Sequence, residues 1–188
     1  MERVGTQPRK YEEHAYVLDY VGRGKSRTVR GRDGIIITAL GEERLTILEL
    51  LGVPNSTFET GEKVYIGKEG RTKILSVLGK LDYNSISSVA QDDLPTVVEK
   101  IVSENEQRFI DYMNNSQPLT PRIHALELIP GIGKTYMKVT LEEREKKKFV
   151  DFKDLQERVG FKEPVKQISK RIMEEITGNS RMNLFVKR

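Results

Sequence analysis

The sequence predicts an α+β protein in which a small β-barrel comes first and a helical region follows. Up to about residue 80, short apolar runs rich in β-branched residues are separated by glycine-containing turns. From residue 81 onward, the apolar residues recur at the spacing of three and four that is typical of helices. The 188 residues include 37% hydrophobic and 32% charged side chains, which suits two small cores better than one large core.

Five short strands are expected in residues 1–82, which we take as the first domain. Glycine-rich breaks separate them, for example Gly22-Arg23-Gly24. Strands at this spacing favour a small closed barrel. The third run is rich in Leu and Glu, which also suit a helix, so a helix stays an alternative there. The five runs are 15–21, 35–40, 45–51, 63–66 and 73–78.

Residues 83–117 predict one connecting, acidic helix. Asp92 or Asp93 is suited to cap the helix. Pro95 then falls in the first turn, where a backbone N–H has no hydrogen bond within the helix to lose. The segment 114–118 is rich in Asn and ends in Pro, which predicts a short linker. The apolar stripe consists of Leu94, Val97, Val98, Ile101, Val102, Phe109 and Met113.

Residues 118–188 form the third predicted domain, with four shorter helices arranged as two hairpins. The first two helices are expected at 121–128 and 133–146. Asp151 is placed to cap the third helix, Pro164 to open the fourth, and Gly178 to end it. The apolar faces of the last two helices are Phe152, Leu155 and Val159, and Val165, Ile168, Ile172 and Ile176.

The segment between the first two of these helices is the most informative in the chain. It reads Leu128-Ile129-Pro130-Gly131-Ile132-Gly133-Lys134. Two glycines at i and i+2 allow positive φ and let another backbone approach closely. Ile132 between them is suited to anchor the turn in the core. A helix that begins near Gly133 points its unpaired amides and positive dipole end outward beside Lys134, which is an anion site.

This segment resembles the helix-hairpin-helix motif: an apolar residue, a turn residue, Gly, an apolar residue, Gly and often Lys. The resemblance implies that the hairpin amides hold a backbone phosphate without reading sequence. It also implies that hairpin carbonyls can hold a monovalent cation, here those of Glu127, Ile129 and Ile132. A turn that binds nothing and a hairpin adapted to protein contacts are the alternatives. The implied binding residues are Pro130, Gly131, Ile132, Gly133, Lys134 and Lys138.

Members of this motif family often pair two hairpins about a pseudo-twofold axis, and residues 152–176 have the layout of a second one. Its hairpin, residues 159–164, departs from the pattern because it has a single glycine and because Pro164 has no N–H to offer a phosphate. We therefore expect this hairpin to be mainly structural, with Lys162 and Lys166 as auxiliary contacts.

A second basic element lies in the first domain. A mobile basic loop or short edge strand is expected there, able to reach phosphates, with Tyr16 or Tyr20 stacking on bases if they face outward. A charged, solubilising sheet edge is the alternative. The barrel itself resembles an oligonucleotide/oligosaccharide-binding (OB) fold, in which residues 60–67 are like the beginning of a strand. The basic residues are Arg23, Lys25, Arg27, Arg30 and Arg32.

The charge distribution agrees with a polyanionic partner. Residues 1–80, 81–117 and 118–188 carry net charges of +3, −5 and +6 within a total of +4. Two basic ends that flank an acidic middle attract polyanions, although ordinary solvated surfaces are an alternative explanation of the charge.

Taken whole, the arrangement resembles an archaeal family of unknown function in which a small β-barrel precedes a helix-hairpin-helix region. Its members are described as candidate RNA-binding proteins. The resemblance implies a nucleic-acid-binding protein that favours RNA over DNA, with a link to ribosomal RNA or translation and with ribosomal or transcription proteins as further partners. No cofactor is expected beyond the monovalent cation.

The residue types argue against an enzyme. Without cysteine there is no disulfide, thiolate zinc site or cysteine nucleophile. His14 and His124 lie in different predicted domains without metal-ligand spacing, and Gly131-Ile132-Gly133-Lys134 lacks the spacing of a P-loop. No apolar run approaches the roughly 20 residues of a membrane helix, so a cytoplasmic protein is expected. A protein–protein adaptor and a metal-dependent nuclease are the competing functions.

Overall fold

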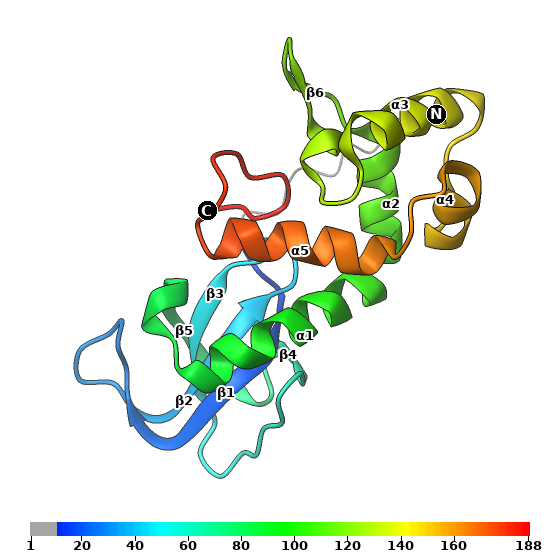
Figure 1. Ribbon diagram of the computed structural model, residues 1–188. Coiled ribbons are helices and arrows are strands. Elements are labelled where there is room, and N and C mark those ends of the chain that lie inside the picture. The colour runs from blue at the N-terminus through cyan, green and yellow to red at the C-terminus, as the bar shows by residue number, and fades with distance from the viewer. Residues whose placement is uncertain (1–10) are drawn as a thin grey trace. The chain divides into compact units, whose positions relative to one another are not determined.

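The computed structural model describes residues 11–188, which form two compact units (Figure 1). One unit comprises the described residues up to Val97 together with Phe185–Arg188, and the other comprises Val98–Leu184. The division therefore falls inside a helix, beyond the predicted first domain of residues 1–82. Within the described residues, no helix combines the length and apolar content needed to span a membrane.

The first unit is built on a five-stranded antiparallel sheet with the order β4-β1-β2-β3-β5. All five strands predicted from the sequence are present, and the ambiguous third run is a strand. The bounds are β1 (His14–Lys25), β2 (Asp33–Gly41), β3 (Ile47–Gly52), β4 (Lys63–Tyr65) and β5 (Ile74–Lys80).

The sheet is curled into a half-barrel, so the predicted small barrel is confirmed in part, without closure by strand pairing among the described residues. Register shifts interrupt β1 between Val17 and Asp19, and the β3–β5 pairing between Glu49 and Leu50. Such irregularities bend strands and increase their twist. Among the described residues, β4 pairs only with β1 and β5 only with β3. The two edge strands therefore leave one side of the half-barrel open.

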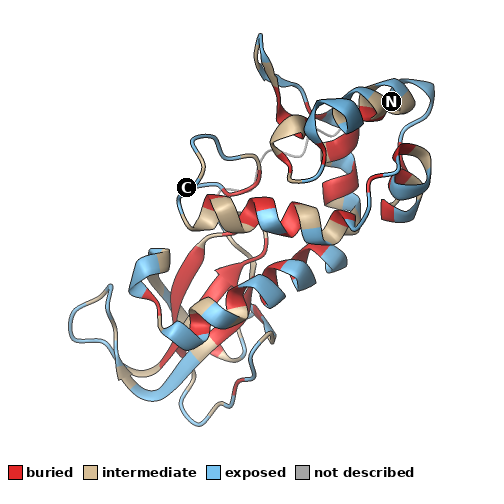
Figure 2. Ribbon diagram, viewed as in Figure 1, coloured by how far each residue is buried: buried red, intermediate tan, exposed pale blue. Residues whose placement is uncertain are grey.

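The core of this unit follows the two-residue period of the strands. Ala15 and Val17 on β1 face the same cluster as Ile37 and Ala39 on β2. Figure 2 shows the resulting band of buried residues along the sheet. The remaining members of the cluster are Leu48, Leu50, Phe58, Val64, Ile66 and Ile74.

The connecting segment begins with the short 3₁₀ helix η1 (Tyr83–Ser85), and α1 (Ser88–Glu104) begins earlier than predicted. The Ser87 hydroxyl oxygen accepts from the Ala90 amide at 3.1 Å and its O–H donates to Asp19 of β1 at 2.6 Å. Ser87 is therefore the cap, and Pro95 lies inside the helix. The predicted caps at Asp92 or Asp93 were wrong because an earlier hydroxyl had already satisfied the first free amides.

The single connecting helix is interrupted at Asn105, which separates α1 from α2 (Glu106–Asn115). Asn105 has φ −117° and ψ 37°, outside the helical region. Its side-chain amide donates to the Ile101 carbonyl at 2.9 Å. The apolar stripe continues across the break, with Ile101 and Phe109 both buried, so the pattern alone did not reveal the interruption.

The predicted helix at 121–128 is absent, and a small hairpin takes its place. Strands β6 (Pro118–Thr120) and β7 (Ile123–His124) pair, and only η2 (Ala125–Leu128), a 3₁₀ turn, is helical. The Thr120 hydroxyl accepts from the amides of Arg122 and Ile123 at 3.2 and 3.0 Å. This local bonding stabilises a tight turn in place of the first helical turn.

The last three helices agree with the prediction. Helix α3 spans Gly133–Lys146, α4 spans Phe152–Val159 and α5 spans Pro164–Ile176. Asp151 caps α4 by accepting from the Asp154 amide at 2.7 Å. Gly178, with φ +80°, follows the end of α5.

A buried ion pair stabilises the second unit. On α5, Arg171 Nε donates to Glu175 Oε2 at 3.0 Å, and the Glu175 side chain is 0% exposed. The same guanidinium donates to the carbonyl of Met182, which ties the chain beyond α5 back onto the helix. Burial, followed by the nearby Glu175 charge, raises the pKa of Tyr112 to about 12.

Candidate nucleic-acid interface

The segment from Leu128 to Lys134 forms a tight, exposed turn that leads directly into α3. Gly131 has φ +83° and Gly133 φ +54°, so both glycines use the left-handed region as their spacing predicted. Ile129 and Ile132 are 1% and 2% exposed and anchor the turn in the core. Because the apolar anchors point inward, the backbone of the two glycines is left facing outward.

The amides of this turn are the chemical feature that matters. The Ile132 amide donates to Ile129, and the Tyr136 amide donates to Ile132. Within residues 11–188, the amides of Gly131, Gly133, Lys134 and Thr135 have no hydrogen-bond partner. The amides at positions 133–135 belong to the first turn of α3, where the helix dipole adds partial positive charge. The turn therefore offers an anion several unused donors.

Gly133 has no steric role within the described chain. A Cβ built at this position would meet no atom within 4 Å, so the space above it is open. Gly131 differs, because a Cβ there would lie 3.3 Å from both Phe161 and Gln167. Gly131 thus allows close packing inside the protein, whereas Gly133 keeps the outer side of the turn uncovered.

The contact at Gly131 brings the two predicted hairpins together. Phe161 belongs to the segment between α4 and α5, and it is 2% exposed. Pro164 occupies the first position of α5, and Gly160 takes φ +82°. The second hairpin thus packs against the first through a buried aromatic ring, which agrees with the mainly structural role predicted for it.

The predicted lysines lie on the exposed side of this pair of hairpins. Lys134 and Lys138 are one turn apart on α3, and both are exposed. Lys162 and Lys166 are also exposed, and each adjoins a residue that packs against Gly131. The exposed carboxylate of Glu163 lies in the same stretch of chain and offsets part of this charge.

Two of the three carbonyls suggested for a monovalent cation already accept a hydrogen bond. The Ile129 carbonyl accepts from Ile132, and the Ile132 carbonyl accepts from Tyr136. A carbonyl oxygen has a second lone pair, so these contacts leave capacity for an ion. The sequence analysis missed Tyr136, which is 38% exposed on α3 and lies 3.7 Å from the Cβ position of Gly160.

The predicted basic loop lies between β1 and β2 in the other unit, and it is held in place by Glu49. This carboxylate, on β3 and 1% exposed, accepts from the hydroxyl of Ser26, the amide of Arg27 and the hydroxyl of Thr28. Burial alone would raise the pKa of Glu49, but these hydrogen bonds lower it. Residues 26–28 are therefore anchored to β3 by these hydrogen bonds.

The predicted cations lie on two elements: Arg23 and Lys25 belong to β1, and Arg27, Arg30 and Arg32 lie in the loop that follows. All five residues are exposed, and Arg27 also donates to the Ser85 carbonyl. Of the two tyrosines considered for stacking, Tyr16 is 0% exposed and Tyr20 is 41% exposed. Tyr16 is therefore excluded as a stacking residue, since its ring belongs to the core.

Comparison with known proteins places the chain in a family. A family model described as "Protein of unknown function (DUF655)" matches residues 11–187. The chain belongs to the DUF655 family. It is 42% identical over 183 residues to MJ0038 of Methanocaldococcus jannaschii, covering 96% of this chain and 82% of that protein. The crystal structure of Af1531 from Archaeoglobus fulgidus is also similar, with TM-score 0.81 and 34% identity over 94% of this chain and 100% of that one. The resemblance to an archaeal family of unknown function is thereby confirmed.

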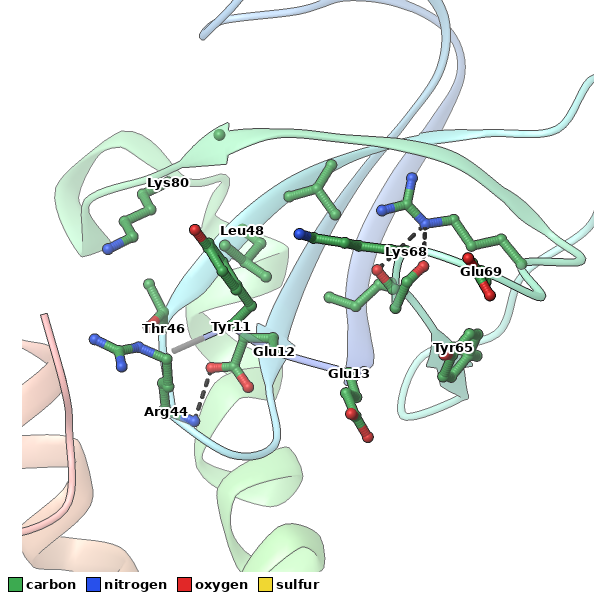
Figure 3. Close-up of a pocket in the computed structure, with 15 residues that line it drawn as sticks. Tyr11, Glu12, Glu13, Arg44, Thr46, Leu48, Tyr65, Lys68, Glu69 and Lys80 are labelled. Carbon is green, nitrogen blue, oxygen red and sulfur yellow. Dashed lines mark hydrogen bonds between the residues drawn. The ribbon is translucent and has the colours of Figure 1, made fainter. Parts of the chain in front are cut away.

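This DUF655 protein also contains a carboxyl pair that sequence analysis did not find. The Glu12 carboxyl group accepts from the Glu43 amide at 2.7 Å and from the Arg44 amide at 2.8 Å. Figure 3 shows the bond from Arg44. Burial, together with a hydrogen bond to the Glu43 side chain, raises the pKa of Glu12 to about 8. Burial acts against ionisation of Glu43 too, but the Glu12 bond and several amides lower its pKa. Because 31 residues separate Glu12 from Glu43, no local sequence pattern indicates this pair.

The Glu12 proton makes stability depend on pH. Between the ordinary pKa of 4.5 and about 8, the folded protein keeps a proton that the unfolded chain has lost. Folding stability from this group therefore falls as pH rises through that window.

We expect Glu12→Gln, which mimics the protonated acid, to flatten the fall in melting temperature between about pH 5 and pH 8. Glu69→Gln, at an exposed position, is the control; parallel curves for Glu12→Gln and wild type would contradict the assignment.

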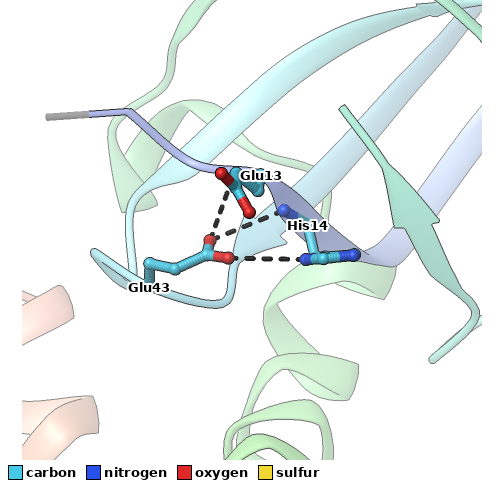
Figure 4. Close-up of side chains that lie close together, drawn as sticks. All are labelled: Glu13, His14 and Glu43. Carbon is cyan, nitrogen blue, oxygen red and sulfur yellow. Dashed lines mark hydrogen bonds and ion pairs between the residues drawn. The ribbon is translucent and has the colours of Figure 1, made fainter. Parts of the chain in front are cut away.

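His14 belongs to the same region of the DUF655 chain. The ligand atoms of Glu13, His14 and Glu43 all lie within 4.8 Å of one another (Figure 4), and they are the residues best placed to hold a metal ion in the described chain. Glu43 already accepts from the Glu13 amide at 3.1 Å and lies 3.5 Å from His14 Nδ1. These bonds account for the cluster as a local network.

The other histidine has a structural role. His124 Nδ1 accepts from the Leu126 amide at 3.1 Å, and the Glu127 carboxylate accepts from the His124 amide at 3.0 Å. Burial, followed by the Arg144 charge, lowers the pKa of His124. A neutral imidazole that accepts at Nδ1 fits this cap of η2, the turn immediately before the glycine hairpin.

Proposed function

We propose that this protein binds nucleic acid, with RNA favoured, by holding backbone phosphate at the turn from Leu128 to Lys134, without catalysis. The turn would act in the manner of a helix-hairpin-helix whose first helix is only the 3₁₀ turn η2. The observation that carries the proposal is a set of four amides, at the exposed residues Gly131, Gly133, Lys134 and Thr135, which have no partner in residues 11–188. A phosphate is the anion that such a turn and helix N-terminus accommodate best.

Several neighbouring features support this proposal. The open space at Gly133 lets a phosphodiester approach the backbone without meeting a side chain. The exposed Lys134 and Lys138 supply positive charge on α3, and the exposed Lys162 and Lys166 supply it at the second hairpin. Backbone amides and lysines recognise phosphate and not bases, so binding should be largely independent of sequence.

In this proposal the first unit contributes auxiliary contacts. Its half-barrel is compatible with an OB-like module, in which a partly open barrel binds oligonucleotides. The exposed Arg23, Lys25, Arg30 and Arg32 at the β1–β2 loop would add phosphate contacts. The preference for RNA, and a role near ribosomal RNA or translation, rest on the family resemblance alone.

Salt dependence tests the electrostatic part of the proposal. With about four to six phosphates neutralised, the logarithm of the binding constant should fall against the logarithm of salt concentration with a slope of about −3 to −5. Fluorescence anisotropy of labelled RNA and DNA, each single-stranded and duplex, at several salt concentrations measures this slope. A slope near zero for all four ligands would contradict phosphate binding.

A protein–protein adaptor is the second candidate, and the β6–β7 hairpin is the observation that favours it. Leu119 is 41% exposed on β6, which projects from its unit (Figure 1). Replacing Leu119 with Asp should abolish capture of a protein partner that survives nuclease and high salt, while phosphate binding stays unchanged. If capture of every partner is lost on nuclease treatment, the adaptor role is excluded.

A further inference from the structure

A pocket of about 850 Å³ opens on the first unit, far along the chain from the glycine turn (Figure 3). It is lined by the chain just before β1, by β3 and β5, and by β4 with the loop that follows it. This is the open side of the half-barrel, where β4 and β5 do not pair. Its volume lies within the roughly 300–1,000 Å³ that is typical of small-molecule sites.

The pocket combines an apolar wall with two aromatic rings. Leu48 and Ile66, both nearly buried, form part of the wall. Tyr11 and Tyr65 are 61% and 36% exposed. In Figure 3 Tyr11 lies in front of Leu48, with Tyr65 at the other end of the pocket. Exposed tyrosine faces stack well on planar aromatic ligands.

Cations outweigh anions around this pocket. The Lys68 ammonium lies 5.3 Å from the centre of the Tyr11 ring. Within residues 11–188, the Lys80 ammonium has neither a hydrogen bond nor an ion pair. Arg44 lies at the same end of the pocket in Figure 3, and its guanidinium, a group with several N–H donors, donates to the Arg188 carbonyl at 3.3 Å. The charged lining residues are Arg44, Lys68, Arg71 and Lys80, and Glu12, Glu13 and Glu69.

We propose that this pocket binds a nucleotide, with the base stacked on Tyr11 and the phosphate held by Lys80 and Arg44. The apolar wall and the tyrosines suit a planar base, and the surplus of cations at one end suits a phosphate. An aliphatic acid would leave the rings unused, and a neutral aromatic compound would leave the cations unused. Both a free mononucleotide and an unpaired nucleotide of a strand present this chemistry.

The pocket proposal depends on the proposed function only if the bound nucleotide belongs to a nucleic-acid strand. In that case the pocket gives the protein a preference for single-stranded segments, and this preference rests on the proposed nucleic-acid binding. If the nucleotide is free, the pocket is independent of the glycine turn. The two sites lie in different units, so each can be altered separately.

Calorimetric titration of the full chain with AMP, adenosine and inorganic phosphate tests whether the pocket binds a nucleotide. Titration with single-stranded oligoadenylate and with an RNA duplex shows whether that nucleotide is free or part of a strand. AMP should bind at least tenfold more tightly than adenosine or phosphate alone. Tyr11→Ala should weaken AMP or single-strand binding by about tenfold, and Tyr11→Phe, which keeps the ring, by less than about twofold. Lys80→Ala should weaken AMP binding but not adenosine binding, and Lys153→Ala, at an exposed position in the other unit, should change neither.

The outcomes distinguish this proposal from that for the glycine turn. Tyr11-dependent binding of AMP supports a free nucleotide, and Tyr11-dependent binding of oligoadenylate without AMP binding supports a strand. If neither ligand binds in a Tyr11-dependent manner, the pocket proposal is overturned. Even in that case the proposed function would stand if Gly133→Leu abolishes duplex binding and Tyr11→Ala leaves it unchanged.

Discussion

Replacing Gly131 and Gly133 together with leucine is expected to weaken nucleic-acid binding by roughly 100-fold or more. Each charge-assisted hydrogen bond from an amide to a phosphate contributes about 1.5–3 kcal/mol, and side chains at these positions remove at least two of them. Both glycines have positive φ, and a Cβ at Gly131 would also press on Phe161. Anisotropy measures the affinity, and circular dichroism checks that the helices persist.

A matched pair of single substitutions separates binding from backbone strain. Gly133 and Gly178 both have positive φ and open space where a Cβ would lie. Gly133→Leu should weaken binding at least tenfold and Gly178→Leu less than twofold, because strain of about 1–2 kcal/mol is common to both. Lys134→Ala should cost about 1 kcal/mol, since the amides remain. Unchanged affinity in a folded Gly133→Leu protein would exclude the turn as the phosphate site.

Replacing Glu175 with alanine is expected to destabilise the second unit by about 3–5 kcal/mol. The change leaves Arg171, whose side chain is 8% exposed, without its closest carboxylate in a buried environment. It also removes a buried side chain that has 0% exposure and creates a cavity. Chemical denaturation followed by far-ultraviolet circular dichroism measures the loss, because this unit contains most of the helical residues.

Glu174 provides the matched control on the same helix. It also pairs with Arg171, at 3.4 Å, but its side chain is 46% exposed. Glu174→Ala should therefore cost less than about 1 kcal/mol, as is usual for exposed ion pairs. Replacing Arg171 and Glu175 together with methionine should cost less than the sum of the single changes, because no lone buried charge remains. Equal costs for Glu174→Ala and Glu175→Ala would contradict the role of burial.

Local signals predicted those parts of the fold that depend on a few neighbouring residues. The cap at Asp151, the start at Pro164 and the termination near Gly178 all lie where their chemistry indicated. The positive φ of Gly131 and Gly133 likewise follows from the absence of a side chain. Each of these features is decided within about one helical turn, so the sequence contains the necessary information.

Local reasoning failed where two local preferences competed. The apolar stripe continues through Asn105, yet the backbone of Asn105 leaves the helical region and separates α1 from α2. Thr120 bonds to the backbone that follows it and stabilises a hairpin where apolar residues had suggested a helix. Periodicity alone does not tell which of two competing hydrogen-bonding patterns has the lower free energy.

By itself, the sequence determined the alternation of the strands, the positions of the last three helices, the cap of α4 and the positive φ of the two glycines before α3. Only the tertiary structure decided which distant residues meet: Glu12 with Glu43, Gly131 with Phe161, and Tyr11 with Lys68 beside the open edge of the sheet. The physical reason is that φ, ψ and capping depend on adjacent residues. Burial, shifted pKa values and pockets instead depend on how separate segments pack.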